Sequence, residues 1–120
     1  MATFFRTKVI KDIGTQKIVV FEVPAATNAT VIGLNLANIT DFAVTASVLI
    51  KDDGSVEGFY VKDVMIPPQT AFKAMIGGEK IVLPTGHQLI VQASSTASVD
   101  AVVSYVDIQQ GEINESIRRK

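Results

Sequence analysis

A chain of 120 residues with 48% hydrophobic and 19% charged residues fits one folded domain, because a chain of this size buries roughly two thirds of its unfolded surface. A net charge of −1, no cysteine and no basic run longer than three residues exclude a disulfide framework, a thiolate site and a basic nucleic-acid patch. The N-terminal residues do not resemble a signal peptide, and no apolar stretch reaches the ~18 residues of a membrane span, so we expect a soluble protein made in a cytoplasm.

The first part of the chain alternates apolar and polar residues with a period of two, which is typical of antiparallel strands. Residues 3–10 predict a strand, residues 12–15 a turn, residues 17–23 a second strand that ends at Pro24, and residues 25–29 a loop. On the first strand, Phe4, Arg6 and Lys8 would share one face, and Phe5, Thr7 and Val9 the other. We expect this N-terminal segment to be extended.

The third predicted strand, residues 30–38, has one face made of small residues. Ile32, Leu34 and Leu36 would lie together on one face, and Gly33, Asn35 and Ala37 on the other. Such a small outer face suggests close approach by another layer or by a second subunit. Residues 38–41 predict the turn that follows.

Residues 43–51 alternate most clearly and are followed by a hairpin signal. Val44, Ala46, Val48 and Ile50 would point inward, and Thr45 and Ser47 outward. Residues 52–55 read Asp-Asp-Gly-Ser, and the Asp-Gly pair would supply the positive φ that such a turn requires.

The second half of the chain predicts five more strands, at residues 59–66, 70–76, 80–83, 88–93 and 99–108. Pro67-Pro68 would end the first of them, and residues 94–98 would form a turn. The stretch IGGEKIVLPTGHQLIVQAS, residues 76–94, is not a phosphate loop, since that loop stands between a strand and a helix. We interpret Gly77-Gly78 and Pro84-Thr85-Gly86 as two turns that bracket a short edge strand.

Eight or nine strands predict an all-β, single-domain antiparallel β-sandwich, with a jelly-roll-like arrangement or a small barrel as the alternative. The domain would cover residues 1–108. Residues 109–120 lose the alternation, and we interpret them as a flexible C-terminal tail or a short helix that docks on a neighbour.

No group of residues predicts catalysis, so we expect no enzyme, no catalytic residue, no cofactor and no metal. His87 is the single histidine, it has no cysteine or second histidine with which to bind zinc, and no G-x-S-x-G elbow occurs. We expect it to be a solvent-facing turn residue.

The acidic residues do not predict a metal site or a catalytic site either. Asp52, Asp53 and Glu57 lack the alternating ligand spacing of a calcium loop, so we expect a charged hairpin tip. Paired-carboxylate chemistry would need two carboxylates in one cleft. Nothing in the sequence brings Asp63, Asp100 or Asp107 together.

Two segments resemble small virion structural proteins of tailed bacteriophages: VPAATNATVIGLNLANITDFAVTASVLI and VMIPPQTAFKAMIGGEKIVLPTGHQLIVQASSTASVDAVVSYVDI. The shared features are a G-L-x-L-A-N strand, a proline turn, a G-G-x-K-I-V-L segment and a closing strand, and they extend over about residues 16–108. His87 departs from the pattern, because an acidic residue is expected after the turn glycine.

The resemblance implies a non-enzymatic virion protein, made in the host bacterial cytoplasm and assembled in multiple copies on the particle. It points first to the neck/collar–tail region, with capsid decoration (cement) as the alternative. The implied partners are copies of the chain itself and other virion proteins (portal/neck, tail or major capsid protein), with no nucleic acid and no membrane.

The charges near the two ends differ in sign from those of the body. Residues 1–17 hold four basic residues against one acid, and the chain ends in Arg118, Arg119 and Lys120. These ends could help copies associate, or they are ordinary solvated termini.

A carbohydrate-binding β-sandwich for host attachment is an alternative of another class. Its candidate stacking aromatics are Phe42, Phe59, Tyr60, Phe72 and Tyr105. The absence of tryptophan weakens this reading.

Overall fold

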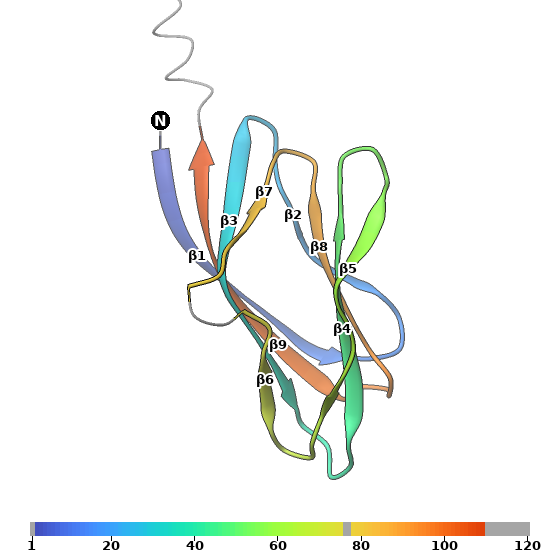
Figure 1. The fold of residues 1–120 in the computed structure, drawn as a ribbon. Coiled ribbons are helices and arrows are strands. Elements are labelled where there is room, and N and C mark those ends of the chain that lie inside the picture. The colour runs from blue at the N-terminus through green and yellow to red at the C-terminus, as the bar shows by residue number, and fades with distance from the viewer. Residues whose placement is uncertain (1, 76–77, 110–120) are drawn as a thin grey trace, which may run out of the picture.

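The computed structural model describes residues 2–75 and 78–109, which form nine β-strands in two facing antiparallel sheets (Figure 1). The strands are β1 (Ala2–Ile13), β2 (Ile18–Glu22), β3 (Thr27–Asn38), β4 (Val44–Lys51), β5 (Glu57–Ile66), β6 (Ala71–Lys73), β7 (Ile81–Leu83), β8 (Gln88–Ala93) and β9 (Val99–Gln109). The predicted all-β antiparallel sandwich is confirmed. Within the described residues, no helix occurs that is long and apolar enough to cross a bilayer.

The strand order identifies the sandwich as a jelly roll. One sheet has the order β1-β9-β3-β6, with β7 also paired to β3, and the other has the order β2-β8-β4-β5. The pairs are nested along the chain: β1 with β9, β2 with β8, β3 with β6 and β7, and β4 with β5. A long hairpin rolled up on itself gives this pairing, which is the double-sheet arrangement of jelly rolls.

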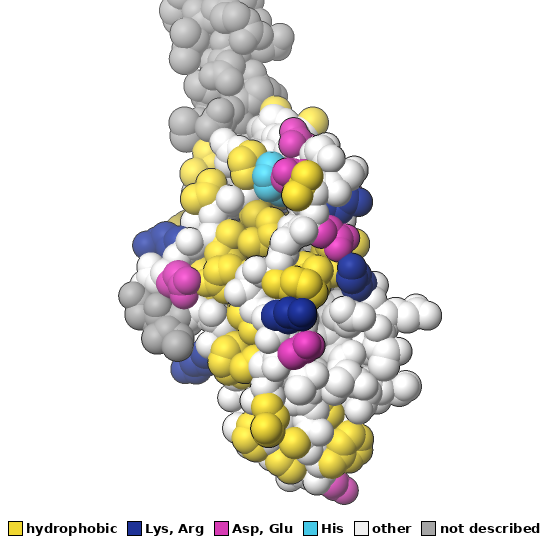
Figure 2. All heavy atoms as spheres, turned by 45° about the vertical axis from the view of Figure 1, so that its right-hand side comes forward, with side chains coloured by type: hydrophobic (Ala, Val, Ile, Leu, Met, Phe, Trp, Pro, Cys, Tyr) yellow, Lys and Arg dark blue, Asp and Glu magenta, His cyan; other side chains and the backbone are white. Residues whose placement is uncertain are grey.

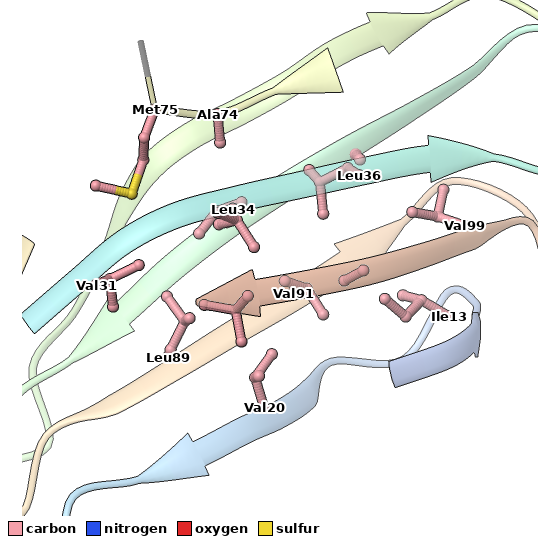
Figure 3. Packing of buried hydrophobic residues seen from close by; sticks show 14 of the residues in the cluster. Ile13, Val20, Val31, Leu34, Leu36, Ala74, Met75, Leu89, Val91 and Val99 are labelled. Atoms are coloured by element: carbon pink, nitrogen blue, oxygen red, sulfur yellow. The ribbon is translucent and has the colours of Figure 1, made fainter. Parts of the chain in front are cut away.

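The hydrophobic core lies between the two sheets. Figure 3 shows β3 side chains, including Leu34 and Leu36, facing side chains of the other sheet such as Val91. Leu36 and Leu89 are fully buried, and each such side chain contributes about 1.5–3 kcal/mol through removal from water. The alternation read from the sequence therefore corresponds to real inward faces.

The first turn begins later than predicted, because β1 continues to Ile13. The pairing with β9 shifts register between Ile10 and Ile13, and Asp12 takes a positive φ of 58° within this irregular stretch. The shift turns Ile13 into the core, where it is 1% exposed. The predicted loop 25–29 is also shorter than expected, since β3 begins at Thr27.

Ile32 does not lie on the inward face that the alternation assigned to it. The register of β3 with β9 shifts between Val31 and Gly33, so that Val31, Leu34 and Leu36 are buried while Ile32 is 44% exposed. A bulge of this kind places two consecutive residues against one on the partner strand. The prediction for Ile32 was wrong for this reason.

β4 confirms most of its predicted faces. Val44, Ala46 and Val48 are buried in the core, and Ile50 packs against it. Ser47 is outside the core cluster but only 4% exposed, and its Oγ accepts a hydrogen bond from the N–H of Asp63 on β5 at 2.9 Å. The expected outward serine is thus covered by the neighbouring strand.

The β4–β5 hairpin is confirmed, but its left-handed residue is not the glycine. Asp52 Oδ1 accepts hydrogen bonds from the N–H groups of Gly54 (2.8 Å) and Val56 (2.9 Å). Ser55 has a φ of 70°, and Gly54 is not among the described residues with positive φ. The prediction that the Asp-Gly pair supplies this angle was therefore wrong by one residue.

The remaining strands follow the prediction with changes in length. β5 ends at Ile66, directly before the two prolines, and β8 covers residues 88–93 as predicted. Of the predicted strand 70–76, only Ala71–Lys73 is a strand, and Ile76 and Gly77 lie outside the described residues. β9 continues to Gln109, one residue beyond the prediction, and residues 110–120 lie outside the described part.

β7 is the short edge strand that the sequence predicted. In the described part of the chain it pairs with β3 alone. Gly78 and Gly86 have φ values of 84° and 86°, a backbone conformation that L side chains rarely adopt. A Cβ at Gly86 would also come within 3.0 Å of the Cβ of Asp53.

Candidate functional site

Most of the carboxylates singled out in the sequence make separate structural contacts. Glu57 forms an ion pair with Lys17 at 2.8 Å, which lowers the pKa of the Glu57 carboxyl. The Asp12 N–H donates to Asp100 at 2.9 Å. Across residues 2–75 and 78–109, no group of three His, Cys, Asp or Glu side chains is placed to hold a metal ion.

Asp52 and Asp63 are used within the β4–β5 hairpin. The N–H groups that donate to Asp52 lower the pKa of its carboxyl, with Val56 as the largest contributor. Asp63 Oδ1 accepts a long bond of 3.3 Å from Ser47 Oγ. Among the described residues that line the hollow beside Asp63, no second carboxylate is present to act as its catalytic partner.

His87 is half-buried rather than solvent-facing as predicted. Its N–H donates to Pro84 O at 3.1 Å, and its carbonyl accepts from Val23 N–H at 2.9 Å, so the backbone of the turn is well held. Its Nδ1 is buried without a hydrogen-bond partner. The nearby Thr85 hydroxyl donates to Thr27 O at 2.7 Å.

Both tyrosines stay protonated at neutral pH. Burial, together with the Glu79 carboxylate beside it, raises the pKa of Tyr60 to about 12. Burial and the nearby Asp107 also raise the pKa of Tyr105. Neither phenol is poised to act as a base.

A hollow of about 220 Å³ opens between β1, β2 and β9. Its lining is Arg6, Phe21, Glu22, Pro24, Tyr105, Asp107 and Gln109. The Arg6 Nε donates to Asp107 Oδ2 at 2.6 Å, and the Tyr105 ring stacks on Phe21 with 4.3 Å between centroids. The polar groups and the aromatic faces in this hollow are therefore largely engaged with each other.

The aromatic residues proposed for sugar stacking do not form one platform. Tyr105 is 9% exposed beneath its stacking partner, and Tyr60 and Phe72 pack against the core. Phe42 and Phe59 are exposed at 53% and 51%, one in the β3–β4 turn and the other on β5.

A smaller polar hollow of about 150 Å³ lies over β4, β5 and β8. It is lined by Thr45, Ser47, Asp63, Gln92, Ala93 and Ser94. Several of its polar groups bond internally, as in the 2.9 Å bond from Thr45 N–H to Ser94 Oγ.

The turns opposite the N-terminal end of β1 carry an exposed apolar tip. It consists of Ile39, Phe42 and Met65, which are 45%, 53% and 66% exposed. Figure 2 shows hydrophobic side chains gathered at the lower end of the molecule, where the β3–β4 and β5–β6 turns lie in Figure 1.

The outer side of the five-stranded sheet forms a second exposed apolar surface, called here the apolar sheet face. Register and alternating burial assign to it Thr3, Phe5, Thr7 and Val9 of β1, Val102, Ser104, Val106 and Ile108 of β9, Asn28, Thr30, Ile32, Gly33 and Asn35 of β3, and Val82 of β7. Phe5, Val9 and Val82 are 80%, 58% and 63% exposed. These residues are uncharged, and the charged residues of the same side, Lys73 opposite Asn35 and Asp100 opposite Ala37, lie at one margin.

The small residues predicted on the outer face of β3 contribute to this surface. Gly33 pairs with Ser104, and Asn35 pairs with Val102. Sequence reasoning identified the small face of β3, and it grouped Phe5, Thr7 and Val9 on one side of β1 without assigning that side inward or outward. It missed that β9 joins them, because pairing between the first and last strands leaves no local signal.

No protein-family model matches this sequence, and a comparison with curated proteins finds none that matches. The fold resembles solved structures at low identity. The T13 particle of infectious bursal disease virus aligns with a TM-score of 0.55 at 13% identity, over 91% of this chain and 32% of that chain. This chain thus spans about a third of the length of the viral chain it matches.

Two further structures match over most of both chains. The subunit of the Bacillus endospore appendages, which are disulfide-linked pili, aligns with a TM-score of 0.55 at 6% identity, over 89% of this chain and 88% of that chain. The capsid of Helicobacter pylori bacteriophage KHP30 contains a chain that aligns with a TM-score of 0.50 at 9% identity, over 89% and 87%. At these identities the likeness concerns the fold.

Proposed function

We propose that this chain is a non-enzymatic structural subunit of a bacteriophage virion, assembled in multiple copies on the particle. The observation that carries the proposal is the apolar sheet face, an exposed side of a jelly roll whose charged residues Lys73 and Asp100 lie at one margin. Exposed contiguous apolar surface marks sites of association. The sequence resemblance to small virion proteins and the fold likeness to viral capsid chains support the same conclusion.

Two positions on the particle follow from different observations. The sequence resemblance favours the neck/collar–tail region, where the partners would be portal, neck or tail proteins. Capsid decoration, with the major capsid protein as partner, is favoured by the match to a phage capsid chain of similar length. In both positions the chain would contact copies of itself or other virion proteins.

The test is the composition of purified particles. We expect the chain in a fixed ratio to the major capsid protein, and electron microscopy with a labelled antibody should place it either at the neck or over the head. Detection in the infected-cell lysate but not in particles would remove the proposal. Binding to a glycan array, with no signal on particles, would favour the attachment alternative instead.

A further inference from the structure

We infer that two copies of this chain pack together through their apolar sheet faces, sheet against sheet, about a two-fold axis. The inference rests on the proposed function and deepens it by naming the surface and its first occupant. In a two-fold contact the same patch serves both copies, so the patch must be complementary to itself. The apolar sheet face meets this condition for the reasons given below.

The residues in the central rows of this face are all uncharged, so no charges would face each other there in a dimer. Phe5 and Thr30 both pair with Val106, and Thr7 and Gly33 both pair with Ser104. Lys73 lies opposite Asn35 at one margin, and Asp100 of β9 lies opposite Ala37, two residues further along β3. When the face meets its own copy, the middle is therefore apolar and any ion pairs fall at the rim, where they cost little.

The outer side of the four-stranded sheet does not have an apolar middle with its charges confined to the rim. It carries the ion pair between Lys17 and Glu57, and the Lys62 ammonium lies over the Phe59 ring at 5.3 Å. Figure 2, which brings the β4 and β5 side forward, shows basic and acidic side chains scattered between the hydrophobic ones. Packing this side against itself would desolvate charges, whereas the middle of the apolar sheet face has none.

The area of the face is sufficient for a dimer. Three strands of about nine residues, together with the three-residue strands β6 and β7 beside β3, cover about 500 Å² at a spacing of about 4.8 Å and a rise of about 3.3 Å per residue. Two such faces would bury about 1,000 Å² in total, about the size that a biological interface should reach. Stacked sheets pack about 10 Å apart, and the small residues Gly33 and Ser104 at the centre allow that approach.

Light scattering during size exclusion of the purified full chain tests the inference. We expect a mass of two copies at micromolar concentration. Phe5→Lys and Val9→Lys should each weaken the dimer by about tenfold or more, because a lysine there would be desolvated opposite an apolar partner. The matched controls are Phe59→Lys and Val56→Lys, at residues that are 51% and 66% exposed on the other sheet and its hairpin, and these should leave the dimer unchanged.

A mass of one copy, a mass other than two copies, or equal effects of the face and control variants would overturn the inference. All four variants change exposed residues, so unchanged circular dichroism should show that each folds. A single cysteine at Thr7 provides a second readout, because the natural chain contains none. A short thiol crosslinker should join two Thr7→Cys copies efficiently and two Val56→Cys copies poorly, and equal yields would contradict face-to-face packing.

The two proposals fail separately. A chain that is present in particles but monomeric after purification would keep the virion function and remove the two-fold contact. A chain that forms the dimer but is absent from particles would keep the two-fold contact and remove the virion function.

Discussion

Asn38 is a buried amide at the end of β3, and its side chain joins two turns that are distant in sequence. Its Nδ2 donates to the carbonyl oxygens of Phe42 at 2.8 Å and Ile66 at 3.0 Å. Its Oδ1 accepts from the Thr40 N–H at 2.8 Å. The sequence identified residues 38–41 as a turn but could not reveal the bond to Ile66, because that partner lies 28 residues away.

Replacing Asn38 with alanine should lower the free energy of unfolding by about 3 kcal/mol, since several hydrogen bonds are lost and buried carbonyls remain unpaired. Urea unfolding followed by circular dichroism measures the change. Asn35→Ala is the control, because Asn35 lies on the outward face of the same strand, and it should change the value by less than about 0.5 kcal/mol. Equal effects would show that the buried network does not stabilise the fold.

Tyr60 should make the free energy of unfolding decrease at alkaline pH. Its pKa in the folded chain is about 12, above the ordinary value of 10.0. As the pH rises, the unfolded chain therefore loses the Tyr60 proton before the folded chain does. The stabilising contribution of the protonated Tyr60 to the free energy of unfolding is complete below about pH 10 and is lost as the pH approaches about 12. Tyr60→Phe should make the decline of unfolding free energy shallower over this range, as measured by urea unfolding at several pH values. An unchanged slope would contradict the assignment.

At the scale of strands, the alternation in the sequence was a good guide to the inward faces, and the bulges were not predicted. Leu34 and Leu36 are buried as expected, whereas Ile32 is exposed beside the register shift of β3. Asp63 similarly takes a φ of 50° where β5 is irregular against β4. A bulge depends on the register of the partner strand, and one strand's sequence does not contain that register.

The β4–β5 hairpin gives a test in which sequence and structure disagree. Ser55 occupies the left-handed region with a φ of 70°, so Ser55→Gly should raise the free energy of unfolding by about 0.5–1 kcal/mol. Gly54→Ala should be tolerated, because a Cβ there would meet Asp52 Oδ1 at an ordinary 3.5 Å. Thermal and urea unfolding of both variants provide the measurement. A destabilising Gly54→Ala together with a neutral Ser55→Gly would restore the assignment based on sequence.

At the scale of the molecule, the sequence predicted the class of fold but not which strands are neighbours. Period-two alternation and turn residues are local, and they were enough to indicate an antiparallel sandwich. The apolar sheet face and the larger hollow both depend on β9 lying beside β1, and Arg6 reaches Asp107 across 101 positions of sequence. Such sites arise from closing the roll, so they could be recognised only after the strand order was known.

The nested pairing also predicts where the folding unit ends. Residues 2–75 and 78–109 contain all nine strands and the buried core described here, and β9 pairs with β1 on one side and β3 on the other. A chain that ends after Ser98 loses Val99 and Val103, each 1% exposed, and should not fold. A chain that ends after Gln109 should keep its free energy of unfolding within about 0.5 kcal/mol of the full chain. Circular dichroism and urea unfolding distinguish the two, and a loss above about 1 kcal/mol on removing residues 110–120 would mean that this segment stabilises the sandwich.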